Sequence, residues 1–145
     1  MQSVHAVTQV SITMPNVPSS LAKVGDRLRA ASVNISAISC TEGPQQTIIH
    51  LIVDDMETAK IVLKELGAVT ITEVLAFKMK NFPGAIASIG REFAAADINI
   101  RNIYATTCGK EAMVYVVVED VQAAMELWKR WKERNGNTAA MAHSH

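Results

Sequence analysis

The chain has 145 residues, of which 49% are hydrophobic and 19% are charged, and its 14 basic residues balance its 14 acidic ones. This composition excludes a disordered chain. The zero net charge argues against nucleic acid or an anionic membrane as a partner, because both are bound through basic surfaces. Two cysteines are too few for a disulfide framework. With neither a signal-peptide pattern nor an apolar run of membrane length, we expect a soluble cytoplasmic protein.

The chain contains an internal duplication with a period of 65 residues. Shifted by this distance, Met14–Leu66 aligns without a gap on Met79–Trp131, with 15 identities over 53 positions. Self-similarity of this extent indicates two copies of one structural unit. A unit of 65 residues is too long for one solenoid repeat and has the size of a small α+β module.

Each copy begins with a strand and a helix. Gln9–Met14 alternates polar and apolar residues, as a half-buried strand does. Pro18, or Pro83 in the second copy, is placed to open a helix. Gly25 and Gly90 lie inside this helix, and a recurrent helical glycine indicates the close approach of another backbone, here a strand or the facing helix. The apolar stripe expected to be buried is Leu21, Val24, Leu28 and Ala31, or Ile86, Ile89, Phe93 and Ala96.

A β-hairpin and a second helix follow in each copy. The apolar residues of Asn34–Cys40 change phase along the strand, as do their equivalents in the second copy, which predicts a β-bulge. A turn at Glu42–Gln45, or Thr107–Lys110, then leads to a third strand that is apolar on nearly every residue. Asp54 or Asp55 caps the second helix, with Glu57 placed for a capping box. The residues expected to be buried on this helix are Met56, Ala59, Leu63 and Leu66, or Val121, Ala124, Trp128 and Trp131.

The order of elements predicts the fold class α+β, with two tandem ferredoxin-like βαββαβ units, each an antiparallel sheet with both helices on one face. The extended segment Ala68–Lys80 can serve as the last strand of the first unit and the first strand of the second. We therefore place the first unit at residues 1–68, the second at 69–134 and a polar C-terminal tail at 135–145. Any fourth strand of the second unit within Asn135–His145 would be weak.

The third strands are apolar on both faces. Ile48 and Ile52 in the first copy, and Met113, Tyr115 and Val117 in the second, are expected to point away from the helices. An antiparallel sheet normally shows polar residues on that face. An exposed apolar area of this extent predicts a covering partner, either the other unit or a second chain.

Catalytic and metal motifs are missing from the sequence. It contains no Ser-His-Asp set at a recognisable spacing, no Gly-x-Ser-x-Gly, no dinucleotide-binding glycine motif and no Walker A motif. We interpret His50 as a structural histidine, His143 and His145 as parts of a solvated tail, and Cys40 and Cys108 as structural or incidental. The sequence thus predicts no catalytic residue, no metal site and no cofactor.

The turn between the first strand and the first helix is the best candidate for a binding site. It contains Asn16-Val17-Pro18-Ser19-Ser20 in the first copy and Asn81-Phe82-Pro83-Gly84-Ala85 in the second. One interpretation is only a well-formed helix start. The other is anion capture, because free N–H groups and the helix dipole at this end can hold a carboxylate.

The run Asn81–Ile89, followed by Ala96-Asp97-Ile98-Asn99-Ile100, resembles the ACT domain family, and the first copy is similar but degraded. The resemblance covers about residues 7–132 as two tandem copies. It implies a regulatory module that binds a small molecule, usually an amino acid, at the seam between two modules. The ligand would touch the first-turn loop of one module and the second strand of the other. The implied ligand-binding residues are Asn81, Phe82, Gly84 and Ala85 with Asn34 and Ile35, and, in the related site, Asn16, Val17, Ser19 and Ser20 with Asn99 and Ile100.

Three functions remain open at this point. The first is a free-standing amino-acid-sensing protein, with no catalytic domain, that controls a partner such as a metabolic enzyme or its own homo-oligomerisation. The second is a ligand-independent oligomerisation or interaction module that binds through its apolar sheet face. The third is a small enzyme on a ferredoxin-like scaffold, for which the sequence offers no nucleophile or acid/base pair.

Because Ser19 replaces a family glycine, we expect the loop of the second copy to be the better site.

Overall fold

The structure is a computed structural model that describes residues 3–143. In chain order these residues form β1 (Ser3–Pro15), α1 (Ser20–Ala30), β2 (Ile35–Glu42), β3 (Gln46–Val53), α2 (Met56–Leu63), β4 (Ala68–Lys80), α3 (Ala85–Ala95), β5 (Ile100–Cys108), β6 (Glu111–Val118) and α4 (Val121–His143). The described chain therefore runs twice through the predicted β-α-β-β-α order.

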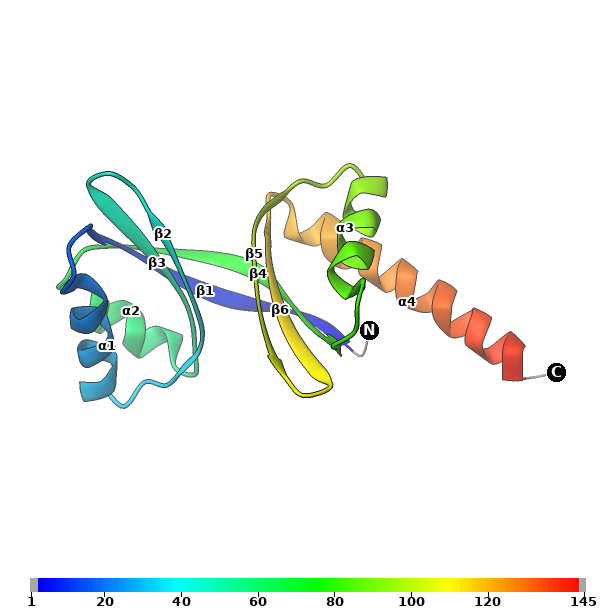
Figure 1. Ribbon diagram of the computed structural model, residues 1–145, viewed down its shortest axis with the longest axis horizontal. Coiled ribbons are helices and arrows are strands. Elements are labelled where there is room, and N and C mark those ends of the chain that lie inside the picture. The colour runs from blue at the N-terminus through cyan, green and yellow to red at the C-terminus, as the bar shows by residue number, and fades with distance from the viewer. Residues whose placement is uncertain (1–2, 144–145) are drawn as a thin grey trace. The chain divides into compact units, whose positions relative to one another are not determined.

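The chain divides into two compact modules. The N-terminal module is Val7–Glu73, and the C-terminal module combines Ser3–Ala6 with the chain from Val74 onward. The strand order is β2-β3-β1-β4 in the N-terminal module and β5-β6-β4-β1 in the C-terminal module. In each module two helices cover the same face of the sheet, α1 with α2 and α3 with α4 (Figure 1). The predicted pair of ferredoxin-like units is confirmed.

The strands β1 and β4 are each shared between the two modules. Both have 13 residues, and they are equivalent in the 65-residue repeat. The first part of β1 contributes Val4 to the core of the C-terminal module, and the first part of β4 contributes Val69 to the core of the N-terminal module. The double role predicted for Ala68–Lys80 is confirmed, and β1 has the same double role.

The module limits differ from the predicted boundaries 1–68 and 69–134 for this reason. Ser3–Ala6 supplies the fourth strand of the C-terminal module, in place of the weak strand considered within Asn135–His145. The backbone of α4 continues as a helix to His143, through most of the predicted tail 135–145. Strand pairing, rather than position along the chain, decides which residues belong to a module.

Each module has its own apolar core between sheet and helices. The core of the N-terminal module includes Ile12, Leu28 and Leu63, and all three side chains are fully buried. The helix stripes are predicted correctly at Val24, Leu28, Ile89 and Phe93, but the prediction is wrong at Leu21 and Ile86, which are 52% and 48% exposed. These two residues occupy equivalent positions in the first turn of their helices.

The residues of β3 and β6 point toward and away from the helices as predicted from the sequence. Ile49, Leu51 and their equivalents Val114 and Val116 belong to the helix-covered cores. The alternate residues therefore lie on the opposite face of the sheet, where Ile48 remains 38% exposed. On that same face Ile52, Tyr115 and Val117 are nevertheless buried.

The predicted local features are confirmed with one change. The strand pairing shifts register between Ile35 and Ala37, and again between Ile100 and Asn102, as expected for a bulge in each second strand. The second helix is capped by Asp55, whose carboxylate accepts the backbone N–H of Thr58 at 3.1 Å and its hydroxyl at 2.7 Å. Thr58, rather than the Glu57 expected for a capping box, therefore completes the helix start. These two bonds also lower the pKa of Asp55.

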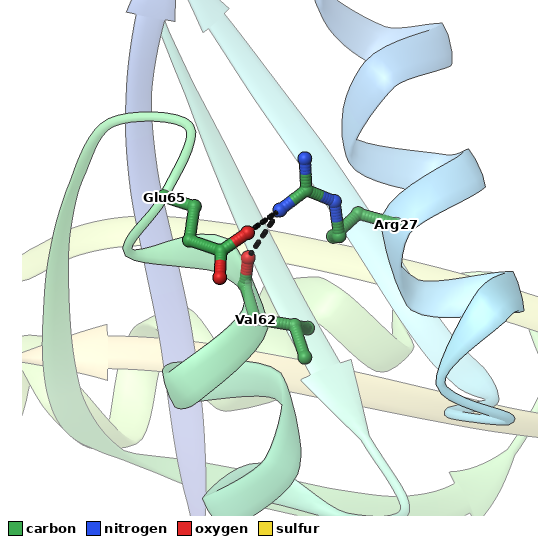
Figure 2. Close-up of polar contacts among 3 residues, drawn as sticks. All are labelled: Arg27, Val62 and Glu65. Carbon is green, nitrogen blue, oxygen red and sulfur yellow. Dashed lines mark hydrogen bonds and ion pairs between the residues drawn. The ribbon is translucent and has the colours of Figure 1, made fainter.

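An ion pair links the two helices of each module. In the N-terminal module Arg27 of α1 binds Glu65, just beyond α2, and donates to the carbonyl of Val62 at 3.3 Å (Figure 2). In the C-terminal module the equivalent of Arg27 is Glu92, which pairs with Arg134 of α4 at 3.3 Å. The charges are exchanged between the modules, but the connection between helices is kept.

Candidate functional site

The loop before the first helix is fastened to the hairpin of the same module. Asn16 donates its backbone N–H to the carbonyl of Gln45 and its side-chain amide to the carbonyl of Gly43, both at 2.9 Å. Asn81 makes the equivalent bonds to Lys110 at 2.7 Å and to Gly109 at 3.2 Å. Both asparagines are among the predicted ligand-binding residues. Because their amides already hold the hairpin, their first effect is to position the loop.

The two helix starts differ in backbone conformation. Gly84 precedes α3 with φ at +92°, a left-handed value that favours glycine, whereas Ser19 precedes α1 with φ at −82°. Neither residue makes a side-chain cap, so no side chain consumes the first-turn N–H groups of α1 or α3. The first N–H group of each helix is bonded to a loop carbonyl, so the N–H groups left for a carboxylate are those of the two following residues.

The remaining loop residues divide into exposed and buried ones. Val17 and its equivalent Phe82 are about half exposed. Ser20 and Ala85 are buried, and the hydroxyl of Ser20 is bonded to the carbonyl of Pro15. A ligand can therefore meet the side chains of Val17 and Phe82. The backbone N–H groups of Ser20 and Ala85 are already donated to the carbonyls of Val17 and Phe82, at 3.1 and 3.2 Å.

The second half of the predicted site lies at the other end of each helix. A left-handed residue lies two positions after each helix, Ser32 or Asp97, with φ of 58° or 57°. The backbone of Asn34 is held by Asp54, whose carboxylate accepts its N–H at 2.9 Å and whose own N–H is donated to the Asn34 carbonyl at 3.1 Å. The exposed side-chain amide of Asn34 is then the polar group that it can offer to a ligand, and Asn99 is likewise exposed.

A hollow of about 430 Å³ opens beside this second half in each module. In the N-terminal module it is lined by Gly25, Leu28, Arg29, Ser32, Val33, Asn34 and Ile35. The hollow in the C-terminal module has the same volume and is lined by the equivalent residues, Gly90, Phe93, Ala94, Asp97, Ile98, Asn99 and Ile100. Four predicted site residues, Asn34, Ile35, Asn99 and Ile100, thus line hollows.

A single module does not bring the two halves of the predicted site together. The loop lies before the helix and the hollow after it, and a helix of 11 residues spans roughly 16 Å. A ligand that touches both a loop and a second strand therefore needs elements from two different modules.

The model of one protein family matches nearly the whole of this architecture. It describes an ACT domain pair and covers residues 5–131. The chain belongs to this family. The match confirms the resemblance that the loop and second-strand motifs indicated, and it covers both ACT modules, including part of the N-terminal half of β1.

Solved structures place the ACT pair among known folds. A protein from Bacteroides thetaiotaomicron is 28% identical over 89% of this chain and 90% of its own, with a TM-score of 0.83. The ligand-free regulatory subunit of aspartate kinase from Thermus thermophilus is 19% identical, with 88% and 95% of the chains covered and a TM-score of 0.66. The corresponding subunit from Thermus flavus is 19% identical over 89% and 96%, with a TM-score of 0.56. No curated protein sequence matches the chain.

A polar cluster on the N-terminal ACT module is not anticipated by the sequence motifs. The hydroxyl of Ser11 lies 2.8 Å from Nδ1 of His50, and the side-chain amide of Gln9 lies 3.3 Å from both. Gln9 and Ser11 are buried, and partial burial lowers the pKa of His50. The signal in the sequence is the alternation of Gln9 and Ser11, which places both on the face opposite the core.

The C-terminal ACT module carries an aromatic pair at the same place. Tyr104 and Tyr115 stack with ring centroids 5.3 Å apart on neighbouring strands. Burial, with a smaller contribution from Tyr115, raises the pKa of Tyr104.

Within residues 3–143, no group of three His, Cys, Asp or Glu side chains is arranged to hold a metal ion. No helix in this part of the chain combines the length and hydropathy needed to cross a bilayer.

Proposed function

We propose that this ACT domain pair is a regulatory protein that binds a free amino acid without transforming it. The observation that carries the proposal is the helix start that both modules share. Each loop is fixed by an asparagine to its hairpin, exposes an apolar side chain and leads into a helix with no side-chain cap. Such a helix start holds a carboxylate through N–H groups and the helix dipole.

The second strand of another module, in this chain or in a second copy, would complete the site. The amide oxygen of Asn34 or Asn99 is suited to accept from the ligand ammonium group. Ile35 or Ile100 would contact its side chain. A ligand that binds two modules at once favours the relative arrangement of the modules for which it has the higher affinity. The size of the effect equals the difference in binding free energy between the two arrangements. This change would then act on an enzyme partner or on self-association.

Titration calorimetry of the purified chain against each of the twenty amino acids tests this function. Gly84→Ala should weaken binding at least about tenfold, because the methyl group strains the loop that presents the N–H groups, and a hydrogen bond to a charged group contributes about 1.5–3 kcal/mol. Gly109→Ala gives a graded comparison, since Gly109 also has a positive φ, of 62°, and open space around it. Because Gly109 acts on the loop only through its carbonyl, which accepts from Asn81, this variant should weaken binding less than Gly84→Ala. Absence of binding across the whole panel would refute the proposal.

A ligand-independent interaction module is the second candidate, and a specific observation favours it. Three equivalent positions carry a partly exposed apolar side chain in both modules. They are Val17, Leu21 and Ile38 in the N-terminal module and Phe82, Ile86 and Ile103 in the C-terminal module. Recurrent exposed apolar residues are typical of interaction surfaces. Light scattering distinguishes the candidates, because this function requires a stable assembly whose mass does not respond to any amino acid.

A further inference from the structure

Neither packing nor backbone conformation within a module requires glycine at Gly25 of α1 or Gly90 of α3. Glycine is among the least favourable residues in a helix interior. A Cβ atom built at Gly25 or Gly90 meets nothing within 4 Å, so the predicted close backbone is wrong. Neither glycine has a positive φ. Alanine would fit both positions and suit the helix better, yet both copies carry glycine.

What the two glycines share is the hollow beside them. Gly25 lines the hollow of the N-terminal module, and Gly90 lines that of the C-terminal module. Each glycine therefore leaves space at the mouth of a hollow of about 430 Å³, a volume within the usual range of small-molecule pockets.

The lining of the hollows indicates what they can accept. Three of the seven lining residues in each hollow belong to the apolar core or pack against it, namely Leu28, Val33 and Ile35 in one module and Phe93, Ile98 and Ile100 in the other. Polar residues also line both hollows, namely Arg29, Ser32 and Asn34 in one module and Asp97 and Asn99 in the other. A lining that combines apolar residues with a few polar groups is suited to a ligand that has both an apolar side chain and a polar end.

Resting on the function proposed above, we infer that each hollow receives the side chain of the bound amino acid and that Gly25 and Gly90 determine how large it can be. The ligand class is an amino acid with an aliphatic side chain. The carboxylate and ammonium groups stay at the edge, near the exposed amide of Asn34 or Asn99. A larger residue at either glycine position closes the hollow without disturbing the core.

The test compares leucine substitutions at matched positions of the same helices. Gly25→Leu and Gly90→Leu place a side chain in the hollows. Ala22→Leu and Ala87→Leu place the same side chain on α1 and α3 at exposed positions that line neither hollow. Circular dichroism checks the fold of all four variants. Gly25→Ala and Gly90→Ala should raise the Tm by about 2–4 °C, because alanine is the better helix former.

Calorimetry with amino acids of increasing side-chain size gives the decisive measurement. The combined Gly25→Leu and Gly90→Leu variant should lose about 10–200-fold in affinity for valine, leucine or isoleucine, whichever the wild type binds, relative to alanine and glycine. The combined Ala22→Leu and Ala87→Leu variant should keep the wild-type order of affinities.

Three results would overturn the inference, and they can be told apart. If the wild type binds an amino acid and the glycine variants keep its selectivity, the hollows do not hold the side chain, although the proposed function stands. If the wild type binds none, the proposed function fails and the inference with it. If the glycine variants change the mass measured by light scattering and leave selectivity intact, the hollows are contacts between copies of the chain.

Discussion

The two modules share one backbone plan but build their cores from different chemistry. The N-terminal core places Ile12, Leu28 and Leu63 at positions where the C-terminal core places Phe77, Phe93 and Trp128. The three aromatic rings make edge-to-face contacts, with centroids 4.8 Å apart for Phe77 and Trp128 and 5.8 Å for Phe93 and Trp128. The fold therefore does not depend on a particular kind of apolar residue at these positions.

The third strand compensates for the larger aromatic side chains. Ile49 and Leu51 of β3 correspond to Val114 and Val116 of β6, so each position loses one methylene group where the opposing side chains have grown. Core changes are tolerated best when total volume is kept. The comparison teaches that the smaller residues of the third strand offset part of the added aromatic volume, while residue identity changed at all these positions.

The largest expected effect comes from removing the central aromatic residue. Trp128→Ala should lower the free energy of unfolding by about 3–5 kcal/mol, because it leaves a cavity among Phe77 and Phe93. The aliphatic equivalent, Leu63→Ala, should cost about 2–5 kcal/mol. Urea denaturation followed by circular dichroism measures both, and a loss below about 1 kcal/mol for Trp128→Ala would contradict the central place of Trp128 in the core.

A glycine that has no counterpart in the second module provides the next test. A Cβ atom at Gly67 would lie 2.3 Å from the carbonyl oxygen of Thr13, so Gly67→Ala forces the backbone apart and should cost about 1–3 kcal/mol. The equivalent residue, Lys132, lies within α4, which continues as a helix. Gly25→Ala is the control, and thermal denaturation should show it to be at least as stable as the wild type.

The two helix starts should respond differently to substitution. Gly84→Ala should cost about 1–2 kcal/mol because alanine is disfavoured at a positive φ. Ser19→Gly should change stability by only a few tenths of a kcal/mol, since glycine at the start of a helix is nearly as good as serine. Equal losses in a denaturation series would show that the left-handed geometry is not specific to the C-terminal module.

The smallest expected effect concerns the faces opposite the cores. The lowered pKa of His50 means that the folded chain binds a proton less readily than the unfolded chain. The contribution of His50 to stability is therefore fully present above pH 6.5 and declines as the pH falls below that value toward the lower pKa of the folded state. Denaturation between pH 5 and 8 should show this decline in the wild type and not in His50→Gln.

Tyr115, at the equivalent position, provides the contrast in that experiment. Burial raises its pKa above the ordinary value of 10, so it stays neutral throughout this range. Amide hydrogen exchange can assign the decline to one module, and a decline of equal size in the C-terminal module would contradict the assignment to His50.

The fold was largely predictable from the sequence because the duplication doubled every local signal. The β-bulge is one example, since the same phase change occurs at Ile35 and at Ile100. The double role of Ala68–Lys80 also follows from its length. The role of Ser3–Ala6 was missed, although the repeat extends back to it and pairs Val4 with Val69. A strand that completes a distant sheet leaves little trace in local periodicity.

The candidate site was less predictable than the fold. The motifs located the loops and the second strands. They do not indicate that the side-chain amides of Asn16 and Asn81 are hydrogen-bonded to carbonyls of the hairpins. Nor does the pattern of the helices distinguish a glycine that permits close packing from one that faces open space, as Gly25 does. Both distinctions depend on residues that are far apart in the sequence.

The shared strands have a consequence for how the chain is made. Val4 packs in a core whose remaining strands begin at Val74, about 70 residues later. At about 5–20 residues per second, the ribosome needs roughly 4–14 s to add that length. During this interval the start of β1 has emerged without the sheet that it completes. Assembly of the C-terminal module therefore has to wait for translation, whereas Val7–Glu73 can begin to fold as soon as it leaves the exit tunnel.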